Sequence, residues 1–402
     1  MQHLRRIVIG VIAFVLVTLA VPAQAADPND ASLTGAWLAR TLASNNDLAQ
    51  TPAGEVDYAS TAYAILGLVA ARVDGDQIAA SAQAMARSGD AFIGSPDQAD
   101  SKATAISLMI LAMQAGGLDP TQYAGSTGTR NLYNDLWSMI QPDGAVSTVP
   151  TAYGQAFAIL ALTGTPGGVP DPVRAWLMAQ PCTDSSSPGY GGFGFSGPGS
   201  CDDADPDSTA LAVIALGPMN DIAGVPADII QAARQFLVSV QDSSGGFMST
   251  FSGINANTTG LAVNALTAIS PDSDEAAKGV KFLESLMYGC EVASGSDVVG
   301  AMALTAESRA STPIDPLAAS DQALFFQASA QGIYGFVDQI STPLSYEGGT
   351  TSGSAPLCPS SAASPNSSDS SGASDWWWAL GGFLVVVLVY IGWRFILSGR
   401  RS

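Results

Sequence analysis

The residues best suited to chemistry in this chain are four aspartates that lie within a stretch of six residues, from Asp202 to Asp207. They belong to the segment CDDADPDSTALAVIAL, residues 201–216, and directly precede an apolar run. Carboxyl groups this close together can act as a general acid, hold a cation through their oxygens, or cap the start of a helix. Each interpretation predicts a different arrangement of the same side chains.

Alternate positions in this stretch carry the oxygen ligands that calcium prefers. Asp203, Asp205 and Asp207 are spaced as at the front of an EF-hand loop. Ser208 replaces the glycine expected sixth in such a loop, and Ile214 replaces the glutamate expected twelfth. The sequence therefore predicts no EF-hand, and it leaves open a calcium site of another geometry at the three aspartates.

The same pattern recurs elsewhere in the chain, which favours helix capping at Asp205. In DYASTA, DSKATA and NANTTG, an Asp or Asn stands four residues before a Thr, at Asp57, Asp100 and Asn255. These side chains accept hydrogen bonds from the free N–H groups of a first helical turn, and a carboxylate also suits the helix dipole. We therefore expect one capping device repeated along the chain.

A glycine-rich segment, PGYGGFGFSGPG, lies just before the aspartates and carries Tyr190, Phe193 and Phe195. A disulfide between Cys182 and Cys201 would close this segment into a restrained local loop. Aromatic side chains on such a loop can bind an apolar or planar ligand, or pack against their own loop. The sequence leaves both roles open.

Four cysteines and a single histidine limit the chemistry of the chain. Pairing Cys182 with Cys201 leaves Cys290 to pair with Cys358, and such bonds persist outside the cell. The histidine, His3, lies in the predicted signal peptide, so the mature protein has none. Histidine-dependent triads and the usual zinc sites are thereby excluded.

The two ends of the chain predict export and a membrane anchor. Residues 1–25 combine a basic start, an apolar run and a small-residue cleavage site, as in a secretory signal peptide. Residues 376–397 contain an uncharged stretch long enough to span a bilayer, and arginines follow it. We expect an extracytoplasmic body at residues 26–348, a Gly/Ser/Pro-rich linker at 349–375 and a cytoplasmic tail at 398–402, in a single-pass protein of the cell membrane.

The body between these ends is strongly acidic. The ends hold five of the 15 basic residues and none of the 35 acidic ones, which leaves the body and linker together, residues 26–375, with a net charge of −25. Such a charge repels nucleic acid and anionic lipid, so neither is an expected partner.

An internal repeat organises the body. Six Ala-rich apolar octets predict fully buried helices, and they begin at Thr61, Thr104, Gln155, Thr209, Thr259 and Asp297. Each octet follows a segment with one apolar stripe at helical spacing, as in PADIIQAARQFLVSVQ. Twelve alternating helices from Leu33 to Leu304 predict an all-α fold, an α6/α6 toroid with an inner and an outer layer. An open solenoid of helical hairpins is the alternative, although it would expose a terminal face.

The outer segments also carry motifs that indicate a family. In QDSSGGF, Gln241 is followed by Gly245 and Phe247, and QPDG at Gln141 is a shorter version. This pattern resembles the terpenoid cyclase and protein prenyltransferase toroids, although terpene cyclases usually have Trp at the position of Phe247. DPDSTA is similar to the Asp-x-Asp-Asp-Thr-Ala signature of squalene and hopene cyclases. That resemblance implies that Asp207 is the general acid and Asp205 its neighbour.

The larger domain of the vitamin B12 carriers of the intrinsic factor and transcobalamin type looks similar as well. This similarity implies a corrinoid, cobalamin itself being a candidate, or another large and partly apolar ligand. Tyr63 and Tyr153 on the inner segments would contribute to its site. We therefore expect a tethered surface protein that binds such a ligand, with a membrane transporter as a further partner. A cyclase-like or prenyltransferase-like enzyme and a structural or adhesive domain are the alternatives.

Overall fold

The computed structural model describes residues 28–95, 102–195, 197–217, 225–290, 292 and 297–337. All of them belong to one compact unit, Met1–Cys358. Within these ranges no helix is both long enough and apolar enough to cross a bilayer. The predicted signal peptide, linker, transmembrane helix and tail lie outside the described residues.

The described part of the chain is mostly helical, as the sequence predicts. The strands found there form two short antiparallel hairpins. In the first, β1 (Tyr123–Gly125) pairs with β2 (Gly128–Arg130), and in the second, β3 (Phe247–Ser249) pairs with β4 (Gly253–Asn255). Both hairpins connect helices, so they do not form a sheet layer of their own.

Five of the six predicted apolar octets lie in buried helices. These helices are α3 (Tyr58–Ala71), α6 (Ala103–Ala115), α8 (Ala152–Thr163), α10 (Pro206–Leu216) and α12 (Ala256–Ile269). Their small residues allow neighbouring backbones to approach closely. Gly260, for example, lies directly against the main chain of Gln331 and Gly332.

The predicted amphipathic segments form the helices that pack around these five. They are α2 (Pro28–Ser44), α4 (Gly75–Ser88), α7 (Leu132–Ser138), α9 (Asp171–Met178), α11 (Ala227–Ser239) and α13 (Asp274–Leu286). In α11 the buried residues Ala233, Phe236 and Leu237 form the apolar stripe that the helical period predicts. The short helices α5 (Asp90–Ile93) and α14 (Ala306–Ser311) and the 3-10 turn η3 (Pro120–Gln122) complete the connections.

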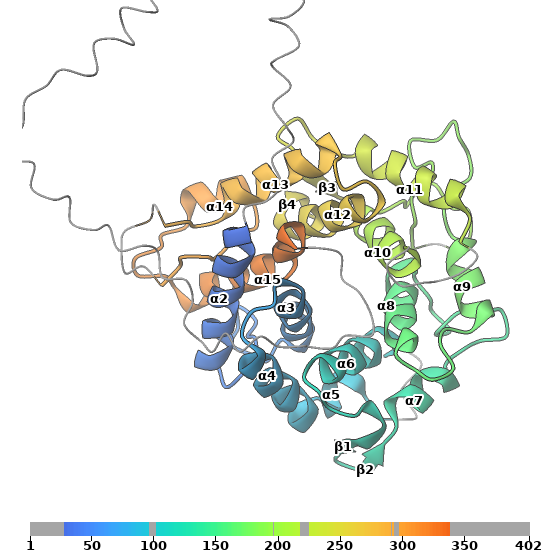
Figure 1. The fold of residues 1–402 in the computed structure, drawn as a ribbon, viewed down its shortest axis with the longest axis horizontal. Coiled ribbons are helices and arrows are strands. Elements are labelled where there is room, and N and C mark those ends of the chain that lie inside the picture. The colour runs from blue at the N-terminus through green and yellow to red at the C-terminus, as the bar shows by residue number, and fades with distance from the viewer. Residues whose placement is uncertain are drawn as a thin grey trace, which may run out of the picture. The chain divides into compact units, whose positions relative to one another are not determined.

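The sixth buried helix lies later in the chain than the sequence predicts. It is α15 (Ala319–Gly332), which continues into the 3-10 turn η5 (Ile333–Phe336). The inner helices contact one another in a closed cycle, in the order α3, α6, α8, α10, α12, α15 and again α3 (Figure 1). The expectation that the repeats end at Leu304 is therefore wrong, because the segment after it supplies the helix that closes the cycle.

The predicted sixth octet, Asp297–Leu304, is not helical. Its main chain pairs with the end of α13: the amide of Tyr288 donates to Ala301 at 2.8 Å, and that of Ala303 donates to Leu286 at 3.1 Å. Two β-branched valines and a glycine at φ 94° oppose a helix at this point. The apolar residues here belong to a turn that resembles a helix in composition only.

This turn belongs to a device that recurs after the outer helices. A glycine with positive φ places its main chain against the next outer helix, and a Cβ there would meet backbone. The pairs are Gly144 with Pro172, Gly191 with Ala232, Gly245 with Lys278, and Gly300 with Leu33. Because Gly300 contacts Leu33 of α2, the turn of the last repeat packs against the first outer helix.

A second recurring contact joins each of these turns to an inner helix. The turn amide donates to a side-chain oxygen at the position where the octet begins: Phe193 to Thr209 at 2.9 Å, Phe247 to Thr259 at 3.0 Å, and Met302 to Ser329 at 2.8 Å. Ser329 therefore corresponds in the sixth repeat to the threonines of the fourth and fifth. This correspondence fixes the register of α15.

Candidate functional site

Asp205 is the N-cap of α10, as the recurring pattern predicts. Its Oδ2 accepts from the amide of Ser208 at 2.8 Å, and its Oδ1 accepts from the hydroxyl of Thr250 at 3.0 Å. Asp57 and Asn255 cap α3 and α12 in the same way. Both oxygens of Asp205 are thus engaged in holding a helix and a hairpin together.

The capping prediction is wrong for the second inner helix. Lys102 occupies the N-cap of α6 and makes no side-chain capping bond there. Asp100, the residue expected in this role, lies outside the described residues. Relative to Thr104, the helix α6 begins later than α3, α10 and α12 begin relative to the threonines of their own repeats. The spacing in the sequence therefore predicted the cap too early in the chain.

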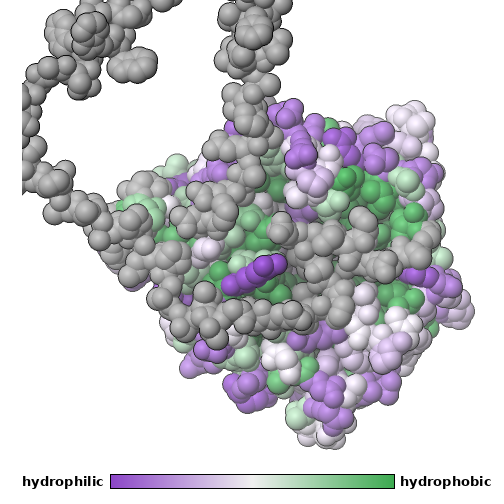
Figure 2. All heavy atoms as spheres, in the orientation of Figure 1, coloured by the Kyte–Doolittle hydropathy of each residue, from purple (hydrophilic) through white to green (hydrophobic). Residues whose placement is uncertain are grey.

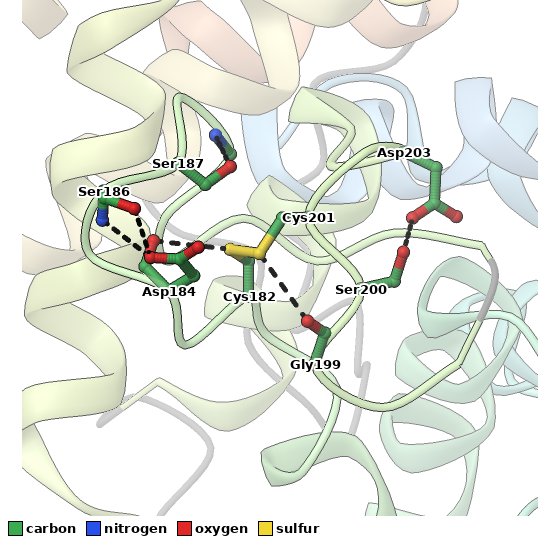
Figure 3. Close-up of a disulfide and its surroundings, with 9 residues drawn as sticks. Cys182, Asp184, Ser186, Ser187, Gly199, Ser200, Cys201 and Asp203 are labelled. Carbon is green, nitrogen blue, oxygen red and sulfur yellow. Dashed lines mark hydrogen bonds between the residues drawn. A yellow bond between two sulfur atoms is a disulfide. The ribbon is translucent and has the colours of Figure 1, made fainter.

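Asp203 serves the neighbouring loop. Its carboxylate accepts from the amide of Phe195 at 2.6 Å. It also accepts from the hydroxyl of Ser200 at 2.6 Å (Figure 3). With Asp203 and Asp205 so engaged, the three alternate aspartates do not fit a calcium site. Across the described ranges, no group of three or more Asp, Glu, His or Cys side chains is arranged to hold a metal ion.

The predicted disulfide between Cys182 and Cys201 is present and closes the glycine-rich loop (Figure 3). Phe193 is buried in the core, whereas Phe195 packs against the exposed Phe251 with ring centroids 5.6 Å apart. Tyr190 is half-buried. The three loop aromatics therefore do not act together, since one of them fills the core.

Cys290 also takes part in a disulfide. Its expected partner, Cys358, lies outside the described residues.

Asp207 has surroundings that differ from those of Asp205. It is half-buried in the first turn of α10, and its Oδ1 is buried without a hydrogen-bond partner among the described residues. Burial, followed by the negative charge of Asp205, raises the pKa of Asp207 to about 6, although a hydrogen bond with Thr258 opposes this shift. A carboxyl group with this pKa can hold or release a proton near neutral pH.

Tyr63 and Tyr153, both predicted as ligand-binding residues, lie next to each other. Their hydroxyl oxygens are 2.8 Å apart, and the ring of Phe157 is centred 5.2 Å from Tyr153 and 5.9 Å from Tyr63. Burial raises the pKa of Tyr63 to about 12 and that of Tyr153 well above its usual value. The charge of Asp207 contributes to both shifts, so the two hydroxyls and this carboxylate share one electrostatic environment.

Equivalent positions of four inner helices carry polar, half-buried side chains. Each position lies two residues before the residue at which its octet begins: Tyr153, Asp207, Asn257 and Gln327. Contacts also join neighbouring helices near these positions. Gln327 donates to Asp57 at 3.0 Å, and Thr258 bonds to Asp207. We call these four residues, together with Tyr63, the polar collar.

One turn beyond the collar residues of α8, α10 and α12 the side chains are apolar and buried. They are Phe157, Leu211 and Leu261, each at most 3% exposed. The corresponding residue of α15 is Gln331, which is half-buried. The polar collar thus lies one helical turn before a layer of apolar side chains. On the face shown in Figure 2, hydrophilic residues gather around the outer helices and hydrophobic residues lie closer to the centre.

Sequence analysis did not identify Asn257 and Gln327 as site residues. Asn257 lies within NANTTG, where only Asn255 was interpreted, and Gln327 lies in the interior of α15 and belongs to none of the motifs. Comparing the residues that lie two positions before each octet would have identified both. For Gln327, that comparison also requires the knowledge that the sixth octet begins at Ser329.

No protein-family model matches the chain, and no curated protein matches it. Among solved structures, the chain is similar to the crystal structure of a protein from Actinoplanes. The two share 17% sequence identity with a TM-score of 0.45, and the match covers 75% of this chain and 98% of that chain.

Proposed function

We propose that this protein is an α/α toroid, tethered outside the cell by a C-terminal helix, that binds a partly apolar small molecule at the cell surface. The cyclic contacts of the inner helices and the contact between Gly300 and α2 support a closed double layer. The sequence of residues 1–25 and 376–397 supports export and the tether. The toroid presents its inner helix starts to the ligand.

The observation that carries this proposal is the proximity of Asp207 to the hydrogen-bonded pair Tyr63 and Tyr153. Polar groups that orient a ligand above apolar side chains that bury it are the usual composition of a small-molecule site. The polar collar provides a carboxylate, hydroxyls and amides, and the layer beneath it provides leucines and Phe157. A ligand with a polar end and an apolar body fits this order, and a corrinoid is one such candidate. Release of the ligand to a membrane transporter would suit the tether.

A specific observation also favours an enzyme of the terpenoid cyclase type as the second candidate. Asp207 has a raised pKa, and its charge acts on Tyr63 and Tyr153, whose rings cluster with that of Phe157. A protonated carboxyl can act as a general acid, and aromatic faces stabilise the cation that forms. Asp205 would assist through the charge that keeps the proton on Asp207.

Binding assays on the purified full chain in a nonionic detergent separate these functions. Native mass spectrometry identifies any co-purified molecule, and cobalamin and squalene are then added separately. Saturable binding that weakens in Tyr153→Phe and Asp207→Asn, with the exposed Asp202→Asn as the matched control, supports a binding protein. Conversion of squalene that is lost in Asp207→Asn supports the enzyme. If neither compound binds and nothing co-purifies, a structural or adhesive role replaces both.

A further inference from the structure

Two buried acceptor oxygens in the polar collar lack donors. Asp207 Oδ1 and Asn257 Oδ1 have no hydrogen-bond partner among the described residues. They stand at equivalent positions of α10 and α12, which pack against each other. A buried acceptor without a donor lowers the stability of the protein, and more so when it is charged. A ligand that brings N–H groups to both oxygens would remove this cost.

The charges around Asp207 are negative. Asp205 on the same helix acts on Asp207, and Asp57 at the start of α3 acts on Tyr63. The other titratable groups in this environment are Tyr153 and Tyr334, and burial keeps both in the neutral hydroxyl form by raising their pKa. No basic side chain contributes to the pKa shift of Asp207. The net charge of −25 on residues 26–375 further increases the local concentration of cations.

An aromatic cluster contains the two tyrosines on which the charge of Asp207 acts. Tyr63, Tyr153 and Phe157 form a cluster with centroid separations of 5.2 and 5.9 Å. The face of an aromatic ring attracts an organic cation, and the ring also buries the hydrocarbon next to the charge. The cluster therefore suits a cationic nitrogen with an apolar substituent better than it suits a hydrated ion.

We infer that the polar collar recognises a protonated primary or secondary amine with an apolar body. This inference rests on the proposed binding function and specifies its ligand class. The ammonium group donates N–H bonds to Asp207 Oδ1 and Asn257 Oδ1, while the aromatic cluster holds the adjacent carbons. A quaternary ammonium carries the same charge but has no N–H, and a neutral alcohol has one donor and no charge.

Three probes with the same phenylethyl body test this assignment. Isothermal titration calorimetry on the full chain in nonionic detergent, at about pH 7.5, compares 2-phenylethylamine, 2-phenylethanol and phenylethyltrimethylammonium. We expect the amine to bind at least about 10-fold more tightly than either of the other two. The preference over the alcohol should disappear in Asp207→Asn, and the preference over the quaternary ion should shrink in Asn257→Leu. Asp202→Asn is the matched control and should retain both preferences.

The outcomes of this experiment separate a failure of the amine assignment from a failure of the proposed binding function. If the alcohol binds as tightly as the amine and Tyr153→Phe weakens both, the site exists and the amine assignment is wrong. Equal affinity for the amine and the quaternary ion overturns the role of the N–H donors. If no probe binds and the screen of co-purified molecules is also empty, both the inference and the binding function fail. Thermal melting of each variant confirms that it is folded.

Discussion

Asp205 and Asp207 stand two residues apart at the start of one helix, and burial together with the charge of Asp205 raises the pKa of Asp207. Asp205 has partners for both carboxylate oxygens, one on its own helix and one on the hairpin that precedes α12. Asp207 has a buried oxygen with no partner among the described residues. The same residue type therefore holds the structure together at one position and has an unpaired oxygen at the other.

Removing the cap at Asp205 should destabilise the fold. Asp205→Ala leaves the amide of Ser208 and the hydroxyl of Thr250 without their acceptor. We expect a loss of about 2 kcal/mol in the free energy of unfolding, measured by denaturant titration. Asp202→Ala, at an exposed position of the same stretch, should change it by less than about 0.5 kcal/mol. Equal effects of the two variants would contradict the capping role.

The raised pKa of Asp207 predicts a pH dependence of stability. Because this pKa is about 6 in the folded protein, against the ordinary aspartate value of 3.8, the folded chain retains a proton that the unfolded chain releases between these values. Stability from this group is therefore greatest below about pH 4 and falls as the pH rises through about 6. At neutral pH the ionised carboxylate costs up to about 3 kcal/mol.

Asp207→Asn should remove this dependence. The free energy of unfolding of the variant, relative to the wild type, should increase from about pH 4 to about pH 7. Denaturant titrations at several pH values measure the difference, which cancels the contributions of other carboxyl groups. A difference that stays constant across this interval would show that Asp207 titrates like an exposed carboxyl.

The turn glycines offer a matched pair of substitutions. Gly245 and Gly54 both have positive φ, at 92° and 82°, but only Gly245 faces another backbone, that of Lys278. Gly54→Ala should cost about 1 kcal/mol from backbone strain alone. Gly245→Ala should cost about 3 kcal/mol, since α13 must also move. Denaturant titration gives both values, and similar costs would mean that the close packing of turn and helix contributes nothing.

Loss of the Cys182–Cys201 disulfide should lower stability without abolishing the fold. The bond joins residues 19 positions apart, and closing a loop of this size stabilises a protein by about 3 kcal/mol through the unfolded state. Cys182→Ala combined with Cys201→Ala should lower the free energy of unfolding by this amount. Phe193 should remain buried because Thr209 still accepts its amide. A variant that fails to fold would show that the loop depends on the bond for its structure.

Helix type and order could be predicted from the sequence wherever the apolar pattern is long. The amphipathic segments have apolar residues at the helical period, which predicts a helix with one buried face. Five octets are apolar on all sides, which predicts a helix that is buried on every face. The caps at Asp57, Asp205 and Asn255 were also predictable, because a short polar side chain before an apolar run has a specific local partner. The local disulfide followed from the spacing of two cysteines in one loop.

The sixth inner helix could not be identified from composition. Asp297–Leu304 has the residues of an octet, whereas the segment around Ser329 contains more polar and aromatic residues. The difference lies in contacts distant in the sequence: Gly300 must meet Leu33, and Met302 must donate to Ser329. A pattern within eight residues contains no information about such partners.

The sequence by itself determined the alternation of buried and amphipathic helices, because burial periodicity is a local property of each segment. Tertiary structure alone decided which aspartate keeps an oxygen without a hydrogen-bond partner. Thr250 reaches Asp205 from 45 residues away, whereas Asp207 shares its environment with Tyr63 and Tyr153 from two other helices. The availability and the pKa of a carboxyl group depend on what surrounds it in space, and the closure of the helices supplies those surroundings.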